Sequence, residues 1–170
     1  MSKSNGSQSS VKNIVFAGLG GQGVLKASDI AATAALLAGF DVKKSELHGM
    51  SQRGGSVTSD VRYGDLVRSP MVPSGEADIL VVIAPDQIEV NRWQLREDGL
   101  LIEPSLIDLD ALTNKKSLNV ALLGVLSASS SIAKEHWTQA IREHLAEKLH
   151  EANFAAFDLG RTAAQREQRQ

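Results

Sequence analysis

A chain of 170 residues, with 42% hydrophobic and 22% charged residues, has the size and composition of one globular domain. Its net charge of −2, without a dominant basic patch, argues against nucleic acid or an anionic membrane surface as a partner. The chain contains no cysteine, which excludes a disulfide, a thiolate zinc site and a cysteine-ligated iron–sulfur cluster.

The amino-terminal residues are polar and carry no export signal. Residues 1–10 read MSKSNGSQSS and lack the apolar core of a secretory signal, so we expect a disordered tail there. Apolar runs elsewhere are shorter than the roughly 20 residues that cross a bilayer. We therefore expect a cytoplasmic protein with no membrane partner.

The first part of the chain has the pattern of a strand, a glycine turn, a helix and a second strand. Residues 13–17 form a short apolar run typical of a buried strand, and residues 18–23 are rich in glycine. An alanine- and leucine-rich helix is expected over 24–38, before Gly39, and a second strand over 41–45. Such a βαβ unit is typical of a parallel sheet with a right-handed crossover.

The rest of the chain alternates strands and helices. A strand is predicted at 56–63, and the turn signal Gly64-Asp65 predicts a hairpin partner at 67–69. Further elements are expected as strands at 77–84, 100–103 and 106–109, and as helices at 85–93, 119–129, 136–150 and 151–157. This order predicts one α/β domain over residues 11–160, Rossmann-like, with an open, mostly parallel sheet and helices on both faces. Residues 161–170 are expected to be a polar tail.

The first candidate site is the glycine-rich turn after the first strand. It has the form GxGxxG, and its candidate ligand-binding residues are Gly18, Gly20, Gly21, Gln22 and Gly23. Between a strand and a helix, such a turn lets the backbone approach an anion and directs free helix N–H groups toward it. A tight turn that binds no ligand is the alternative interpretation.

Two familiar nucleotide sites fit this turn poorly. A Walker A loop needs Lys and then Ser or Thr after the last glycine, whereas Val24 and Leu25 follow here. A dinucleotide site needs an acid about 20 positions further on, at the end of the second strand. Glu46 lies near that place, so a free-standing NAD(P)- or flavin-dependent oxidoreductase stays an alternative hypothesis.

The second candidate site is the loop that leaves the second predicted strand. Its candidate ligand-binding residues are Ser51, Gln52, Arg53, Gly54 and Gly55. In a parallel sheet this loop shares the carboxyl edge with the first one, so we expect the two to line one crevice. The Arg53 guanidinium suits a phosphate or carboxylate, and it suits a salt bridge to a neighbouring subunit equally well.

The histidines indicate neither a catalytic group nor a metal site. His48 has no Ser, Cys or carboxylate partner by spacing, and we expect it to make structural hydrogen bonds. His136, His144 and His150 lie at predicted helix positions and lack the spacing of metal ligands. No catalytic residue and no metal site is therefore assigned to this chain.

Three segments together resemble a known family. They are GLGGQG after the first strand, SELHGMSQRGGS at 45–56 and SPMVPSGEAD at 69–78. The chain resembles the gamma-type subunit or domain of 2-oxoacid:acceptor (ferredoxin) oxidoreductases, in the HGM-x-QRGG form of the indolepyruvate or aryl 2-oxoacid (phenylglyoxylate-type) enzymes. The resemblance extends through NVALLG at 119–124 to Gly160 and is most specific in the two loops.

The resemblance implies a division of labour between chains. Enzymes of this family oxidatively decarboxylate a 2-oxoacid to an acyl-CoA and pass the electrons through iron–sulfur clusters to ferredoxin or another acceptor. Thiamine diphosphate, its Mg²⁺ and the clusters would be bound by other subunits of a hetero-oligomer. This chain alone would bind none of them, but would pack on those subunits and help to bind or gate coenzyme A. The absence of cysteine and of a Gly-Asp-Gly thiamine diphosphate motif agrees with that division.

The substrate, the acceptor and the role of the loops stay open at this point. Indolepyruvate, phenylpyruvate and phenylglyoxylate all agree with the resemblance. The acceptor is either ferredoxin or NAD reached through another subunit. A purely structural assembly module, whose loops contact only protein, is the other alternative to the oxidoreductase subunit.

Overall fold

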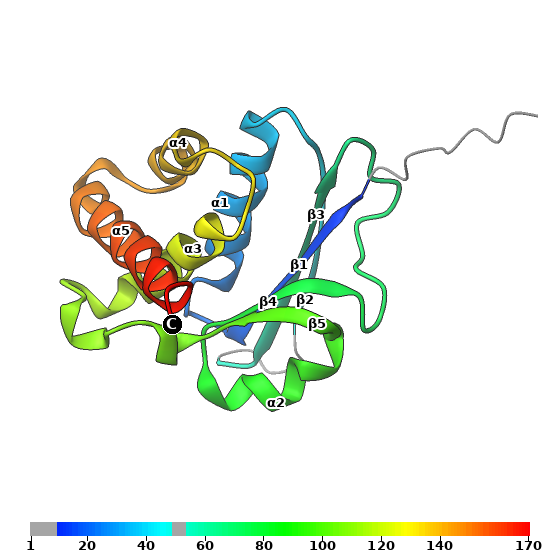
Figure 1. Ribbon diagram of the computed structural model, residues 1–170, viewed down its shortest axis with the longest axis horizontal. Coiled ribbons are helices and arrows are strands. Elements are labelled where there is room, and N and C mark those ends of the chain that lie inside the picture. Colours follow the sequence, from blue (N-terminus) through cyan, green and yellow to red (C-terminus); the bar gives the residue numbers. More distant parts are fainter. Residues whose placement is uncertain (1–9, 49–53) are drawn as a thin grey trace, which may run out of the picture.

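A five-stranded sheet forms the middle of the molecule, which a computed structural model describes over residues 10–48 and 54–170. The strands are β1 Lys12–Leu19, β2 Asp41–His48, β3 Ser56–Gly64, β4 Ala77–Val82 and β5 Leu95–Ile102. The helices are α1 Val24–Leu37, α2 Ile88–Asn91, α3 Leu118–Ala128, α4 Lys134–His144 and α5 His150–Glu167 (Figure 1).

Four strands run in one direction and β3 runs against them. The spatial order is β2-β3-β1-β4-β5. β1 pairs in parallel with β4, and β4 with β5, whereas β3 pairs antiparallel with both β1 and β2. The expected β1-α1-β2 unit is present, but β3 lies between its two strands. The predicted α/β class with an open, mostly parallel sheet is confirmed.

The two faces of the sheet are covered unequally. Successive side chains of a strand point to opposite faces, so Phe16 and Val15 of β1 belong to different clusters. Phe16 lies in the larger core, with residues of α1, α3, α4 and α5. Val15 packs on the other face, where Val72 of a 65–76 segment and Ile88 of α2 contribute the cover. Helices lie on both faces, but the four long ones share one (Figure 1).

The 65–76 segment contains the predicted hairpin strand at 67–69, and that prediction is wrong. Both edges of β3 are occupied, by β1 and by β2, so no edge is left for another partner. Carboxylates hold the segment instead. The Val67 N–H donates to the Asp41 carboxylate at 2.8 Å. The Val72 N–H donates to the Asp60 carboxylate at 2.9 Å.

These two carboxylates should affect stability in opposite ways. Burial raises the pKa of Asp60, whereas the hydrogen bond from Val67 lowers the pKa of Asp41. A carboxyl group whose pKa is raised by folding stabilises the fold at low pH and loses this contribution as pH rises through the folded-state pKa. A carboxyl group whose pKa is lowered by folding stabilises the fold at higher pH and loses this contribution as pH falls through the folded-state pKa. At pH 7 we expect Asp60→Asn to keep the melting temperature or raise it, and Asp41→Asn to lower it.

Thermal unfolding of both variants and the parent chain at pH 7 and pH 3 measures this difference. The difference in melting temperature between the two variants should narrow at pH 3, because protonation of Asp41, which the Asp60→Asn variant retains, removes its stabilising contribution. A melting temperature at pH 7 that is lower for Asp60→Asn than for Asp41→Asn contradicts the assignment.

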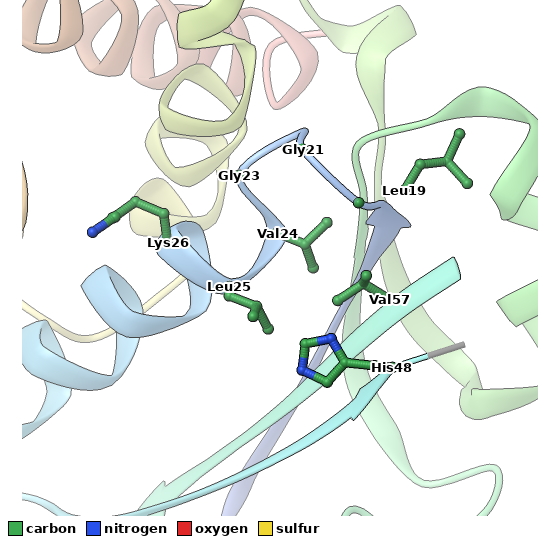
Figure 2. Close-up of a pocket in the computed structure, with 9 residues that line it drawn as sticks. Leu19, Gly21, Gly23, Val24, Leu25, Lys26, His48 and Val57 are labelled. Atoms are coloured by element: carbon green, nitrogen blue, oxygen red, sulfur yellow. The ribbon is translucent and has the colours of Figure 1, made fainter. Parts of the chain in front are cut away.

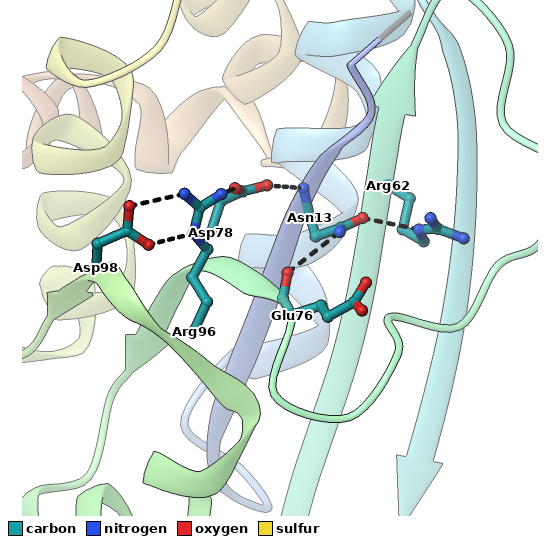
Figure 3. A network of polar contacts seen from close by, with 6 residues as sticks. All are labelled: Asn13, Arg62, Glu76, Asp78, Arg96 and Asp98. Atoms are coloured by element: carbon teal, nitrogen blue, oxygen red, sulfur yellow. Dashed lines mark hydrogen bonds and ion pairs between the residues drawn. The ribbon is translucent and has the colours of Figure 1, made fainter. Parts of the chain in front are cut away.

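Polar side chains tie four strands together at the amino ends of β1, β4 and β5 (Figure 3). Arg62 of β3 donates from Nε to Asn13 Oδ1 at 2.8 Å, and the Asn13 backbone N–H donates to Asp78 Oδ2 at 2.8 Å. Arg96 bridges Asp78, at 2.7 Å, and Asp98, at 2.6 Å. The glycine loops lie at the other end of the strands, so this network stabilises the strand register and takes no part in the loops.

The later elements depart from the predicted boundaries. The predicted helix at 85–93 consists of short turns around α2, and 3-10 turns replace the predicted strand at 106–109. One cause is local: the Asp108 carboxylate accepts the N–H of Asp110 and closes a turn there. The predicted helix at 136–150 is interrupted, because Leu145 after the end of α4 has an extended backbone.

The carboxyl-terminal helix is longer than expected. α5 runs from His150 to Glu167, so most of the residues expected as a polar tail after Gly160 are helical. Ala164 explains this extension, since it packs into the larger core and is only 7% exposed. Residues 1–9 of the expected amino-terminal tail lie outside the described residues. Within the described part of the chain, no helix is both long and apolar enough to span a membrane.

Candidate functional site

The two glycine-rich loops meet at the carboxyl ends of β1 and β2. Leu19 at the end of β1 is paired with Ser56 at the start of β3. The Gly20 N–H donates to the Gly55 carbonyl at 2.8 Å, so the loops are joined backbone to backbone. A Cβ on Gly20 would lie 3.3 Å from the Gly54 nitrogen, which leaves little room for any side chain at that contact.

Gln22 shapes the first loop from within. Its Oε1 accepts the Leu19 backbone N–H at 2.8 Å, and its own N–H donates to the Leu19 carbonyl at 3.2 Å. The side-chain oxygen therefore has a structural partner within the loop, and the ligand contact expected of Gln22 stays a prediction. Its main effect is to close the turn.

Gly23 joins the turn to α1 in a conformation that favours glycine. It lies at φ +79° as the residue before the helix, and its carbonyl accepts the Ala27 N–H at 2.9 Å. A second element contacts it, because the amino end of α3 places Asn119 against this turn. Asn119 Nδ2 donates to the Gly23 carbonyl at 3.2 Å. Sequence reasoning assigned Asn119 no place in the site, although it begins the NVALLG segment of the family resemblance.

A hollow of about 330 Å³ opens beside the turn (Figure 2). Glycine backbone forms one wall, and apolar side chains form much of the rest. The His48 ring projects from the end of β2 toward Leu25 on α1. Lys26 also lines the hollow, but its ammonium reaches the His144 carbonyl at 3.4 Å. The complete lining within the described residues is Leu19, Gly20, Gly21, Gly23, Val24, Leu25, Lys26, His48 and Val57.

Glu46 is not placed where a dinucleotide site needs its acid. It lies on β2, which is separated from β1 by β3. Two strand spacings of about 4.8 Å put β2 roughly 10 Å from the strand that carries the glycine turn. Its carboxylate instead contacts Lys44 Nζ at 3.1 Å and His48 Nε2 at 3.8 Å. In the dinucleotide fold the strand that carries this acid is the direct neighbour of β1.

The structure describes only some of the remaining candidate residues. Ser51, Gln52 and Arg53 of the second loop lie outside the described residues, so their ligand contacts stay predictions. Two of the histidines have hydrogen-bond partners in the fold. His144 Nε2 at the end of α4 lies 2.7 Å from Thr33 Oγ1 of α1, and His150 Nε2 lies 2.7 Å from the Leu145 carbonyl oxygen. Over residues 10–48 and 54–170, no group of three or more potential ligands could hold a metal ion.

Comparison with known proteins identifies the family. A family model described as pyruvate ferredoxin/flavodoxin oxidoreductase matches residues 13–163. The chain belongs to this family. Among curated relatives of the family, the indolepyruvate oxidoreductase subunit IorB of Pyrococcus horikoshii is 33% identical; the match covers 89% of this chain and 95% of that subunit. A pyruvate/ketoisovalerate oxidoreductase common subunit gamma from Thermococcus litoralis is 29% identical; the match covers 84% of this chain and 91% of that subunit.

Two solved structures have the same fold as this chain. The gamma subunit of a keto/oxoacid ferredoxin oxidoreductase from Geobacter sulfurreducens superposes with a TM-score of 0.78 at 25% identity, covering 91% of this chain and 99% of that one. A 2-oxoglutarate:ferredoxin oxidoreductase from Magnetococcus marinus superposes with a TM-score of 0.77 at 19% identity; the match covers 92% of this chain and 31% of that one. The gamma-type resemblance is confirmed. The chain is a subunit of a 2-oxoacid oxidoreductase.

Proposed function

We propose that this chain is the small subunit of an enzyme that oxidatively decarboxylates an aryl 2-oxoacid to an acyl-CoA. Indolepyruvate is the favoured substrate, because of the relatives named indolepyruvate oxidoreductase subunit and the HGMSQRGG form of the second loop. Phenylpyruvate and phenylglyoxylate are the alternatives. Thiamine diphosphate, Mg²⁺ and iron–sulfur clusters belong to partner subunits in this proposal, and electrons leave through those subunits to ferredoxin or another acceptor.

The part of this chain in the reaction is proposed to be contact with coenzyme A. The observation that carries this is the joined pair of glycine loops beside the hollow at the amino end of α1. The first turn of α1 contains no acidic residue, and N–H groups at such a helix end favour an anionic phosphate. The apolar walls suit the less polar parts of the coenzyme. Direct contacts are proposed from the two loops, Gly18–Gly23 and Ser51–Gly55.

A charge placed at Gly21 tests this contact. A Cβ on Gly21 would meet no atom within 4 Å, and aspartate and asparagine tolerate its positive φ of 86° better than most residues. Gly21→Asp adds one negative charge, and Gly21→Asn is the neutral control of the same shape. In the reconstituted complex we expect the KM for coenzyme A to be about tenfold higher for Gly21→Asp than for Gly21→Asn, because a carboxylate a few ångströms away repels the phosphates.

The same experiment separates the proposal from an assembly module. If the loops contact only protein, both variants should show the same KM for coenzyme A. Loss of the complex on size-exclusion chromatography, in both variants, would then indicate that the turn is a subunit interface. An equal KM in two fully assembled variants contradicts the proposed coenzyme A contact.

A further inference from the structure

The amide of Asn119 is bonded at both ends and holds a single orientation. Asn119 is the second residue of α3 and is 8% exposed. Its Oδ1 accepts the Val120 N–H at 3.0 Å, and its Nδ2 donates to the Gly23 carbonyl at 3.2 Å. A flipped amide would set its oxygen against the Gly23 carbonyl oxygen, so only one orientation satisfies both neighbours.

The bond to Gly23 also orients the first N–H of α1. The peptide group between Gly23 and Val24 is planar, and in the trans form its C=O and N–H point in opposite directions. The Gly23 carbonyl is held by two donors, Asn119 Nδ2 and the Ala27 N–H. Fixing the direction of this carbonyl therefore fixes the direction of the Val24 N–H, and Val24 lines the hollow.

Asn119 is itself held in place by the packing of α3 on α5. Gly124, five residues further along α3, lies against the backbone of α5 at Phe157 and Gly160. This close crossing fixes the axial position of α3, and with it the position of Asn119 at its amino end. We infer that Asn119 is a positioning residue, which aligns the first glycine turn for its ligand and connects that turn to the α3–α5 pair. This inference rests on the proposed contact with coenzyme A.

Asn119→Asp is the sharpest test, because it keeps the shape of the side chain, replaces the donor that faces the Gly23 carbonyl by an oxygen and adds a negative charge. The carboxylate still accepts the Val120 N–H, and a negative charge in the first turn of α3 favours folding. Asn119→Ala removes the whole amide. As a control, Asn153→Ala removes an equally buried amide that donates to the carbonyl of Leu149, the residue before α5, at 2.8 Å.

The assembled complex is measured in two ways. In steady-state kinetics we expect the KM for coenzyme A to rise about tenfold in Asn119→Asp and Asn119→Ala, with kcat within about twofold of the parent and Asn153→Ala unchanged. In hydrogen exchange we expect amides of residues 20–24 to exchange about tenfold faster in both Asn119 variants, and at the parent rate in Asn153→Ala.

The two readouts distinguish the inference from the proposed function. Exchange at residues 20–24 that is unchanged in Asn119→Asp overturns the positioning role, whatever the kinetics show. The parent complex could instead show no saturable dependence on coenzyme A while the Asn119 variants exchange faster at residues 20–24. That result supports the positioning of the turn by Asn119 and contradicts coenzyme A as the proposed ligand. Faster exchange with an unchanged KM, in a parent that depends on coenzyme A, also overturns the inference.

Discussion

Gly160→Ala is expected to lower the melting temperature of this chain by about 10 °C. A Cβ at Gly160 would overlap the Ala121 carbonyl oxygen of α3 and lie 3.0 Å from the Cα of Gly124. These atoms belong to helix backbone, so the two helices must separate before a methyl group fits. Overpacking commonly costs about 1–3 kcal/mol, and a backbone clash lies at or above the upper end. At about 2–4 °C per kcal/mol for a chain of this size, a loss of about 3 kcal/mol gives the stated shift.

Thermal unfolding by circular dichroism measures the effect, with Ala155→Leu as the control. Ala155 is exposed on the same helix, and leucine is a good helix former, so the control should change the melting temperature by less than about 2 °C. A Gly160→Ala chain that unfolds within 2 °C of the parent would show that α3 and α5 are not in backbone contact.

Gly23→Ala is expected to have the second large effect, on both stability and the proposed ligand site. A Cβ there would overlap the Asn119 amide nitrogen and lie 3.2 Å from its Cγ, and φ is +79°. The left-handed conformation costs a non-glycine residue about 1–2 kcal/mol, and loss of the Asn119 hydrogen bond adds about 1 kcal/mol. We expect a destabilisation of about 2–3 kcal/mol and, in the complex, a kcat/KM for coenzyme A reduced about a hundredfold because the turn must rearrange.

Gly21→Ala is the matched control for Gly23→Ala. Gly21 lies in the same turn at φ +86°, but a Cβ there would meet no atom within 4 Å. It therefore carries the conformational cost without the clash, and should lose only about 1–2 kcal/mol of stability. Chemical denaturation of the two variants measures the difference. If they are equally stable, the contact between Asn119 and Gly23 contributes nothing, and the clash has no energetic consequence.

Local patterns explain why the first strand, its glycine turn and the following helix were predictable from the sequence. The apolar run at 13–17 falls within β1, and the helix predicted at 24–38 differs from α1 only at its last residue. These elements depend on side-chain periodicity and on glycine at the turn, both of which act over a few residues. The extent of α5 was missed, because its last turns depend on Ala164 reaching a core built from distant segments.

The order of the strands could not be predicted in the same way. The alternating pattern at 56–63 indicated a strand, but nothing in it indicated that this strand would pair with both β1 and β2. Pairing between strands is a contact between segments far apart in the chain, and many arrangements satisfy the same alternation. The hairpin predicted at 67–69 failed for that reason, since both edges of β3 were already paired.

By itself, the sequence determined the family and one limit on the chemistry of this chain. The GLGGQG and HGMSQRGG segments carry the family resemblance, and the lack of cysteine excludes iron–sulfur ligation by this chain. Only the tertiary structure decided that Gly20 and Gly55 are bonded, that Glu46 lies two strands away from the turn, and that Asn119 holds Gly23. Residue types and short spacings are properties of the chain, whereas these three features depend on how helices and strands pack across long separations in sequence.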